Sequence, residues 1–130
     1  MNIDRTKPQI ELIEIQNTNT NYPQYANKTH TISFKIKVTE KNIKENNFVK
    51  DFFGFKLDEN NINISEDNFS IKEIESINEG KIYKIDIKGI SGNGKLSMQI
   101  KEGAIIDKCG LKSESQNIDS GIIIDNTAPV

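Results

Sequence analysis

Hydrophobic and polar residues alternate along several short stretches of the chain. The clearest stretch spans residues 31–39, in which four apolar side chains are each separated by one polar residue: Ile32, Phe34, Ile36 and Val38. Successive side chains of a β-strand point to opposite faces, so this period of two predicts a strand with one buried face and one face in water. Residues 82–88 and 95–101 show the same period and predict two more strands of this kind.

Five further stretches predict strands with less regular patterns. Residues 9–15 alternate, but the phase slips between Leu12 and Ile13, which predicts a bulge or a change of sheet. Residues 53–57 and 118–124 alternate, and residues 62–64 indicate a short edge strand. Residues 69–77 begin as a strand and change phase, and the spacing of Ile71 and Ile74 leaves a helix open as the alternative.

Polar and turn-forming residues separate these stretches. Residues 16–29 predict a loop and residues 40–51 a long connection with a helical turn around residues 43–48. Residues 102–110 predict a loop that holds a short helical turn, and Gly92-Asn93-Gly94 predicts a tight turn. Short strands at regular intervals without a long helix predict an all-β fold, an antiparallel β-sandwich of about seven strands.

The inward-facing positions of these strands predict the hydrophobic core. It consists of Ile10, Ile32, Phe34, Ile36, Val38, Phe55, Leu57, Tyr83, Ile85, Ile87, Leu96, Met98, Ile100, Ile122 and Ile124. A chain of 130 residues is long enough to bury one such core without metal or disulfide support.

Composition narrows the range of functions. The 17 basic residues are balanced by 19 acidic ones, giving a net charge of −2, and both signs are spread along the chain, so no nucleic-acid partner is expected. The longest apolar runs, such as residues 122–124, are too short to cross a bilayer, so this sequence contains no predicted membrane segment.

Catalytic chemistry has little support in the residues present. His30 is the only histidine, which excludes a catalytic triad or a multi-histidine metal site within this chain. Cys109 is the only cysteine, so no intrachain disulfide can form, and no glycine-rich phosphate loop is present. We therefore expect a protein that is not an enzyme and has no catalytic residues.

The pattern Ile-Asp-x-Thr-x-Pro occurs at both ends of the chain, in residues 3–8 and 124–129, and Asp4 and Asp125 are 121 positions apart. A period of one whole domain indicates a tandem array of domains rather than a solenoid of short repeats. The predicted organisation is an inter-repeat joint at residues 1–8, a sandwich at 9–124 and a second joint at 125–130. The expected partners are neighbouring repeats of the same chain.

A family resemblance is carried by several segments of the chain. They are the two joints, the 31–39 strand ending in Thr39-Glu40, residues 83–90, and residues 92–100 continuing into 103–110. The chain resembles the bacterial immunoglobulin-like (Big-type) domains that occur in tandem in cell-surface proteins and adhesins. The resemblance implies an immunoglobulin-like topology, an extracellular location on the bacterial surface, and different sheets for the two strands that flank residues 92–94. Leu111 departs from the family, which often has Asn at this position.

An immunoglobulin-like topology would bring Asp4, Glu40 and Asp107 to one end of the sandwich and Asp125 to the opposite end. Three carboxylates at a joint would suit Ca²⁺, which takes oxygen ligands in flexible geometry and would stiffen the hinge between modules. We therefore name Asp4, Glu40 and Asp107 as candidate metal ligands. In the alternative interpretation, Asp4 and Asp107 are turn residues whose side chains accept hydrogen bonds from nearby backbone N–H groups.

The favoured function is a structural spacer module that holds a binding tip away from the cell. The alternative is a ligand-binding adhesin module that recognises a host protein or glycan through residues 16–29 or 40–52, with an exposed aromatic patch at Tyr22, Tyr25, Phe48 and Phe52. A third option, an enzyme or an accessory domain of an enzyme, requires catalytic residues in neighbouring modules.

Overall fold

The structure, a computed structural model, describes residues 6–127, and this part of the chain folds into eleven strands and two short 3-10 turns. The strands are β1 (Gln9–Asn17), β2 (Tyr25–Ala26), β3 (Ile32–Thr39), β4 (Ile43–Asn46), β5 (Phe53–Leu57), β6 (Asn60–Ile62), β7 (Phe69–Ile77), β8 (Gly80–Ile87), β9 (Gly94–Ile100), β10 (Ile105–Asp107) and β11 (Gln116–Ile124). The 3-10 turns are η1 (Lys50–Phe52) and η2 (Glu66–Asn68).

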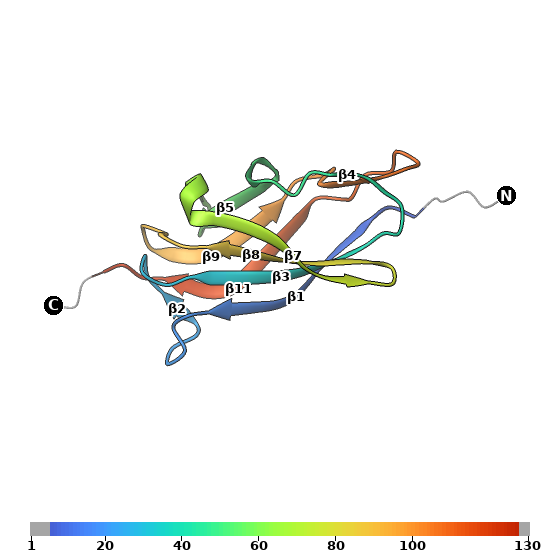
Figure 1. Cartoon of the computed structure of the whole chain (residues 1–130). Coiled ribbons are helices and arrows are strands. Elements are labelled where there is room, and N and C mark those ends of the chain that lie inside the picture. Colours follow the sequence, from blue (N-terminus) through green and yellow to red (C-terminus); the bar gives the residue numbers. More distant parts are fainter. Residues whose placement is uncertain (1–5, 128–130) are drawn as a thin grey trace.

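Two sheets pack face to face (Figure 1). One has the strand order β1-β3-β8-β7 and the other the order β2-β11-β9-β5-β6, and all neighbours are antiparallel except the short β2 beside β11. The seven longer strands therefore follow the immunoglobulin order A-B-E-D in one sheet and G-F-C in the other. The predicted all-β, immunoglobulin-like antiparallel sandwich is confirmed, although four short strands raise the count in the described residues to eleven.

The core lies between the two sheets, and all fifteen predicted core residues are buried. The sequence patterns missed eight other buried residues: Ala26, Phe48, Phe53, Ile64, Ile90, Ala104, Ile105 and Ile118. Four lie between strands, namely Phe48, Ile64, Ile90 and Ala104, and the other four lie within strands. The burial of the residues between strands depends on where each segment crosses the sandwich, which a local period of two does not report.

Bulges explain the two irregular strand patterns. In β1 the pairing with β3 shifts between Leu12 and Glu14, so the predicted phase slip is a bulge. In β7 the pairing with β8 shifts between Glu73 and Glu75, which leaves Ile74 exposed. The helical alternative for residues 69–77 is wrong, because the whole segment pairs with β8 from one end to the other.

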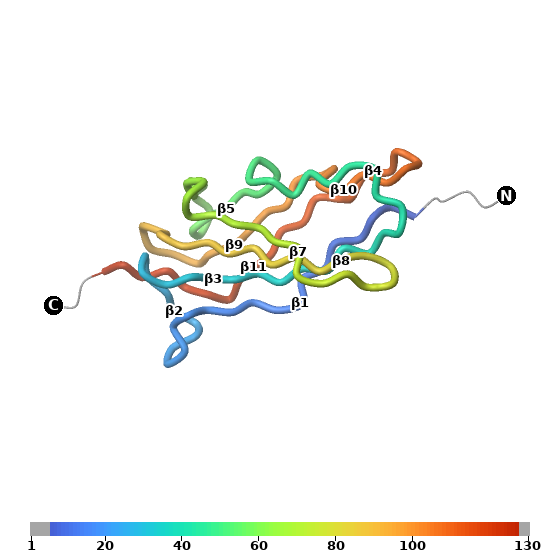
Figure 2. Tube along the Cα trace, viewed as in Figure 1, coloured from blue at the N-terminus to red at the C-terminus, as the bar shows by residue number. Residues whose placement is uncertain are grey.

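The two predicted helical turns around residues 43–48 and 102–110 are also wrong. Both segments instead form strands, β4 and β10, which pair with each other as a separate two-stranded antiparallel ladder. Figure 2 shows the ladder at the end of the sandwich where β1 begins. Each strand is short, and the pairing joins segments about sixty residues apart, so neither segment shows an alternating pattern.

The connection between β8 and β9 passes from one sheet to the other, as the family resemblance implies. Gly92 and Gly94 adopt positive φ angles of 95° and 143°, a region that L side chains rarely occupy, so glycine is needed at this crossing. The local turn signal was therefore correct about backbone conformation. Taken alone it would suggest a hairpin, which the sheet assignments exclude.

The sandwich is elongated, and the described chain enters and leaves it at opposite ends (Figures 1 and 2). We call the end at which β1 begins the N-terminal end, and the end at which β11 finishes the C-terminal end. No helix between residues 6 and 127 has the length and apolar character needed to cross a bilayer.

Candidate functional site

Glu40 and Asp107, two of the three candidate metal ligands, lie at the N-terminal end. Glu40 directly follows β3, where its backbone N–H donates to the Glu79 carbonyl at 2.7 Å, and it lines a depression of about 360 Å³ together with Thr6. Asp107 ends β10, and the next residue, Lys108, donates its backbone N–H to the Asn42 carbonyl at 2.8 Å. The loop after β3 and the turn after β10 are therefore adjacent.

Asp107 is completely buried and organises the turn that follows it. Its Oδ1 accepts hydrogen bonds from the backbone N–H groups of Cys109 and Leu111, both at 2.9 Å. This is the geometry of a turn-forming aspartate, which was the alternative to a metal ligand. The other oxygen, Oδ2, is buried and has no hydrogen-bond partner among residues 6–127.

The fit to a cation is therefore partial. Asp4 lies outside the described residues, and within 6–127 no group of three His, Cys, Asp or Glu side chains is arranged to hold a metal. Asp107 Oδ2 is a carboxylate oxygen, the ligand type that Ca²⁺ prefers, and it lacks a protein partner in the described part of the chain. A Ca²⁺ ion takes six to eight oxygen ligands, so most of its shell would come from other groups.

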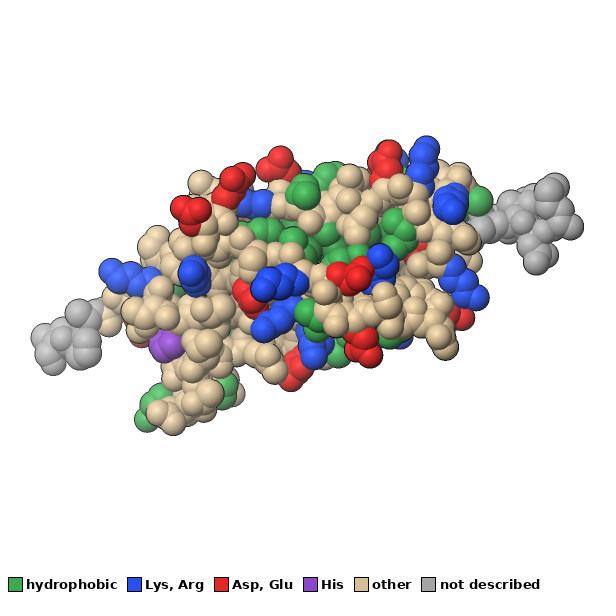
Figure 3. Space-filling model, in the orientation of Figure 1, with side chains coloured by type: hydrophobic (Ala, Val, Ile, Leu, Met, Phe, Trp, Pro, Cys, Tyr) green, Lys and Arg blue, Asp and Glu red, His purple; other side chains and the backbone are tan. Residues whose placement is uncertain are grey.

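Tyr22 and Tyr25 lie at the other end, Tyr22 in the loop before β2 and Tyr25 at the first residue of that strand. They are 69% and 47% exposed and line a depression of about 250 Å³ with His30 and Asp125. The amide of Asn17 fixes this loop by donating to the carbonyls of Pro23 and Tyr25, at 3.1 and 2.8 Å. Figure 3 shows the loop projecting from the molecule, with hydrophobic side chains near the histidine.

The predicted four-residue aromatic patch is wrong, because Phe48 is only 7% exposed. Its ring meets Tyr83 edge-on, with centroids 4.7 Å apart, and lies 5.7 Å from Phe53. Phe52 is half-buried and packs against the core. Segment 40–52 has few apolar residues, so the sequence does not show that β4 directs Phe48 inward.

His30 has a structural contact. Its Nδ1 accepts a hydrogen bond from the backbone N–H of Asn27 at 3.0 Å, which assigns the ring proton to Nε2 in the neutral form. Asn27 in turn accepts from the backbone and hydroxyl of Thr29. The ring therefore supports the turn between β2 and β3. Cys109 is exposed and free.

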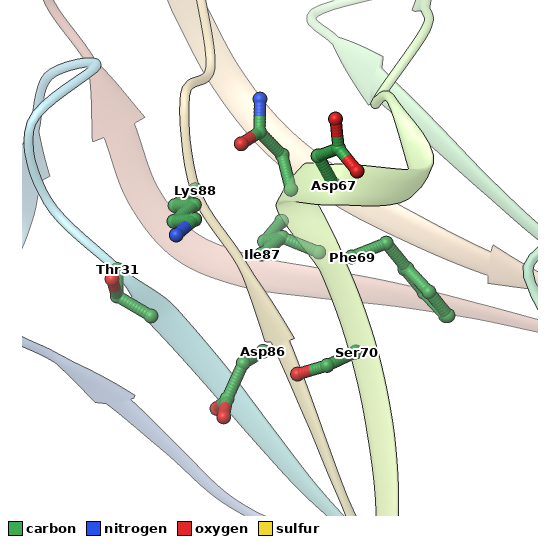
Figure 4. Close-up of a pocket in the computed structure, with 8 residues that line it drawn as sticks. Thr31, Asp67, Phe69, Ser70, Asp86, Ile87 and Lys88 are labelled. Carbon is green, nitrogen blue, oxygen red and sulfur yellow. The ribbon is translucent and has the colours of Figure 1, made fainter.

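A third depression, of about 290 Å³, lies where β3 and β7 begin and β8 ends. Figure 4 shows Asp86 and Ser70 directed toward it, with Asp67 and Lys88 at its margin. Asp86 accepts a hydrogen bond from the Ser33 hydroxyl and lies 3.8 Å from the Lys84 ammonium. The lining holds no histidine, so no hydroxyl is paired with an imidazole base here.

Two ionisable groups near the N-terminal end have shifted pKa values. Burial raises the pKa of Tyr83 above its ordinary value of 10.0, and its hydroxyl accepts a hydrogen bond from the Asn46 amide at 2.6 Å. The hydrogen bond from Lys81 to Glu73, 2.8 Å long, is the main cause that raises the pKa of Lys81. Tyr83 thus joins β8 to β4, and it must stay neutral to remain buried at low cost.

The geometry defines a class of protein, an immunoglobulin-like β-sandwich with polar loops at both ends. Among the described residues, no three His, Cys, Asp or Glu side chains are grouped to hold a metal ion. Comparison of the chain with protein-family models, curated proteins and solved structures gave no significant match. The resemblance to bacterial immunoglobulin-like repeats therefore remains a prediction that depends on the residues that suggested it.

Proposed function

We propose that this domain is a non-catalytic spacer module of a tandem-repeat bacterial surface protein, where it holds a binding tip away from the cell. The observation that carries the proposal is the combination of matching joint sequences with an elongated sandwich that the chain enters at one end and leaves at the other (Figure 1). Modules joined in this way lie end to end, so the length of the array is the sum of the lengths of its modules.

The proposal is tested by measuring how length grows with copy number. Chains of one, two and four copies, joined through the Ile-Asp-x-Thr-x-Pro sequence, are examined by small-angle X-ray scattering. A spacer predicts that the maximum dimension increases by an equal amount with each copy. A matched series joined by flexible Gly/Ser linkers of the same length should grow more slowly, roughly as the square root of copy number. Equal growth in both series would refute the spacer function.

A calcium-stiffened joint is a second proposal, and the buried Oδ2 of Asp107 favours it. Asp107 and Glu40 lie at the N-terminal end, where the described chain enters the sandwich. Asp4 belongs to the joint sequence that precedes the described residues. Burial of an unpaired carboxylate oxygen costs free energy that a bound cation would offset. The test is unfolding of the protein in Ca²⁺ and in EGTA, compared between the unaltered chain and Asp107→Asn.

The alternative function, recognition of a host protein or glycan, retains support only from the exposed Tyr22 and Tyr25. Aromatic faces beside polar groups are common in sugar-binding sites, but here the neighbouring amides of Asn17 and Asn19 are engaged in holding the loop. Binding of the single domain to a glycan array, lost on Tyr22→Ser, would favour this alternative over the spacer.

A further inference from the structure

The last described residues of the chain are held firmly against the C-terminal end of the sandwich. The backbone N–H of Asp125 donates to the Ala26 carbonyl at 2.8 Å, which continues the pairing beside β2. The backbone N–H of Thr127 donates to Asp125 Oδ1 at 2.9 Å. The chain therefore remains ordered by specific contacts after β11 ends at Ile124.

Asn126 is the centre of this arrangement. Its amide nitrogen donates to the carbonyls of Ile90 and Gly92, at 3.0 and 2.7 Å, and its Oδ1 accepts from the backbone N–H of Lys28 at 2.8 Å. Its own backbone N–H donates to Asn93 Oδ1 at 2.7 Å. The two amide N–H donors of the Asn126 side chain thus bind the β8–β9 crossing, and its oxygen binds the segment after β2. One side chain therefore joins both segments to the end of the described chain.

The start of the domain is attached to the sandwich mainly through a buried proline. Pro8 is buried, β1 begins at Gln9, and Lys7 forms an ion pair with Glu114 at 3.2 Å. The repeated joint sequence aligns Thr127 with Thr6 and Pro129 with Pro8. If the next copy folds in the same way, its first buried residue follows Asn126 by only three positions.

Three residues in extended form span about 11 Å, since each adds at most about 3.6 Å. The N-terminal end of the next copy would therefore begin within about 11 Å of the C-terminal end of this one. The face that it would meet includes the exposed rings of Tyr22 and Tyr25 beside Asp125. Exposed tyrosines surrounded by polar groups are typical of protein interfaces rather than of free surface.

We infer that Tyr22 and Tyr25 form a docking face for the N-terminal end of the following copy, and that Asn126 anchors the chain so that the two copies form one rigid body. The partner surface is the polar N-terminal end around Glu40, Lys41 and Glu79. This inference rests on the proposed tandem arrangement and adds its contact surface. The tyrosine face is covered in the array and does not serve as a glycan site.

The two joints differ at the anchoring position. Arg5 occupies the place in the first joint that Asn126 has in the second. A guanidinium has no hydrogen-bond acceptor, so it cannot receive the backbone N–H that Lys28 donates to Asn126. An anchor of the Asn126 kind is therefore expected at the joint that follows the domain and not at the joint that precedes it.

The test uses a two-copy chain in which residues 1–130 are followed directly by residues 10–130, so that the second joint is retained and Val130 takes the place of Gln9. Residual dipolar couplings are measured for both copies in one aligned sample. One rigid body gives the same alignment tensor for both copies. We expect a common tensor for the unaltered two-copy chain, and two different tensors for Tyr22→Ser/Tyr25→Ser and for a four-residue Gly/Ser insertion after Thr127.

The matched control is the Tyr22→Ser/Tyr25→Ser change in the single domain, which should keep its melting temperature because both rings are exposed. Different tensors in the unaltered chain would overturn the docking face. A common tensor that survives the tyrosine changes would also overturn it. If scattering still shows an extended chain in either case, the spacer function stands without the docking face. A glycan that binds the tyrosines equally in both copies of the two-copy chain would overturn the inference as well.

Discussion

At the C-terminal end of the sandwich the chain is held by a neutral amide, Asn126, whereas at the N-terminal end the central polar group is the buried carboxylate of Asp107. Every hydrogen-bonding group of the Asn126 amide except its second lone pair has a protein partner. Asp107 has partners for Oδ1, but its Oδ2 is buried without one among the described residues.

This difference indicates how each end responds to its surroundings. Hydrogen bonds between neutral groups depend little on salt, metal ions or moderate changes of pH. A buried carboxylate oxygen without a partner costs free energy and is sensitive to cations and to substitution. The C-terminal end should therefore be stable on its own, while the stability of the N-terminal end should depend on what binds there.

The largest expected effect comes from removing the buried carboxylate. Asp107→Ala deletes two charge-assisted hydrogen bonds to the turn at residues 108–111, and we expect a loss on the order of 3 kcal/mol in the free energy of unfolding. Urea denaturation measures it. Glu45→Ala, an exposed change on the adjacent β4, is the control and should stay within about 0.5 kcal/mol. Equal losses for both would contradict a central role for Asp107.

The neutral anchor, Asn126, should contribute somewhat less than Asp107 to the free energy of unfolding. Asn126→Ala removes three hydrogen bonds from a half-buried side chain, and we expect a loss of about 2 kcal/mol. Faster hydrogen exchange should accompany it at Lys28 and Thr127. Asn117→Ala, at an exposed position of β11, is the matched control. Unchanged exchange at Lys28 in the Asn126 variant would show that the anchor does not hold this segment.

Calcium should stabilise the N-terminal end of the sandwich and not the C-terminal end. If it binds at Asp107, a concentration ten times the Kd raises the free energy of unfolding by about 1.4 kcal/mol, and EGTA reverses the rise. Asp107→Asn keeps an oxygen acceptor for the turn but loses the charge, so it should fold without responding to Ca²⁺. Asp119→Asn, an exposed change on β11, should respond as the unaltered protein does. A response that persists in Asp107→Asn would place any calcium elsewhere.

The smallest effect concerns Tyr83 at alkaline pH. Because burial raises its pKa above 10.0 in the folded state, the stabilising contribution is fully present below that value and is lost as the pH rises through the folded pKa. We expect the melting temperature to fall as the pH rises above about 10, and to fall less for Tyr83→Phe. Lys81 shifts in the same direction and is present in both proteins.

Tyr83→Phe also loses the hydrogen bond to Asn46, so its stability at neutral pH should be lower by about 1 kcal/mol. The informative quantity is therefore the change with pH and not the value at one pH. Tyr22→Phe removes a tyrosine hydroxyl from an exposed ring and serves as the control. Identical pH profiles for Tyr83→Phe and the unaltered protein would show that another group causes the alkaline loss.

The long strands could be predicted because their burial is decided by local alternation. In β3, and in β8 and β9 after their first residues, one face of the strand packs on the core, so the buried residues recur at every second position. The phase slip in residues 9–15 was visible for the same reason, since a bulge shifts that alternation.

The candidate sites were harder to predict, since they depend on segments that are distant in the sequence. Phe48 was predicted as an exposed ligand-binding residue, but pairing of β4 with β10 leads it into the core. Asp107 was chosen from its position in the resemblance, but only the structure shows that one of its oxygens holds the turn. Asn126 was missed completely, because its partners lie 34 to 98 positions away.

The sequence alone determined the all-β class, the strand positions and most of the core, because a period of two forces one face of each strand inward wherever it packs. It also contained the repeated joints that led to the tandem proposal. Only the tertiary structure decided how the two ends are built. Hydrogen bonds such as those of Asn126 and the β4–β10 ladder form between groups that the fold brings together, and their energies depend on burial and geometry that no local pattern records.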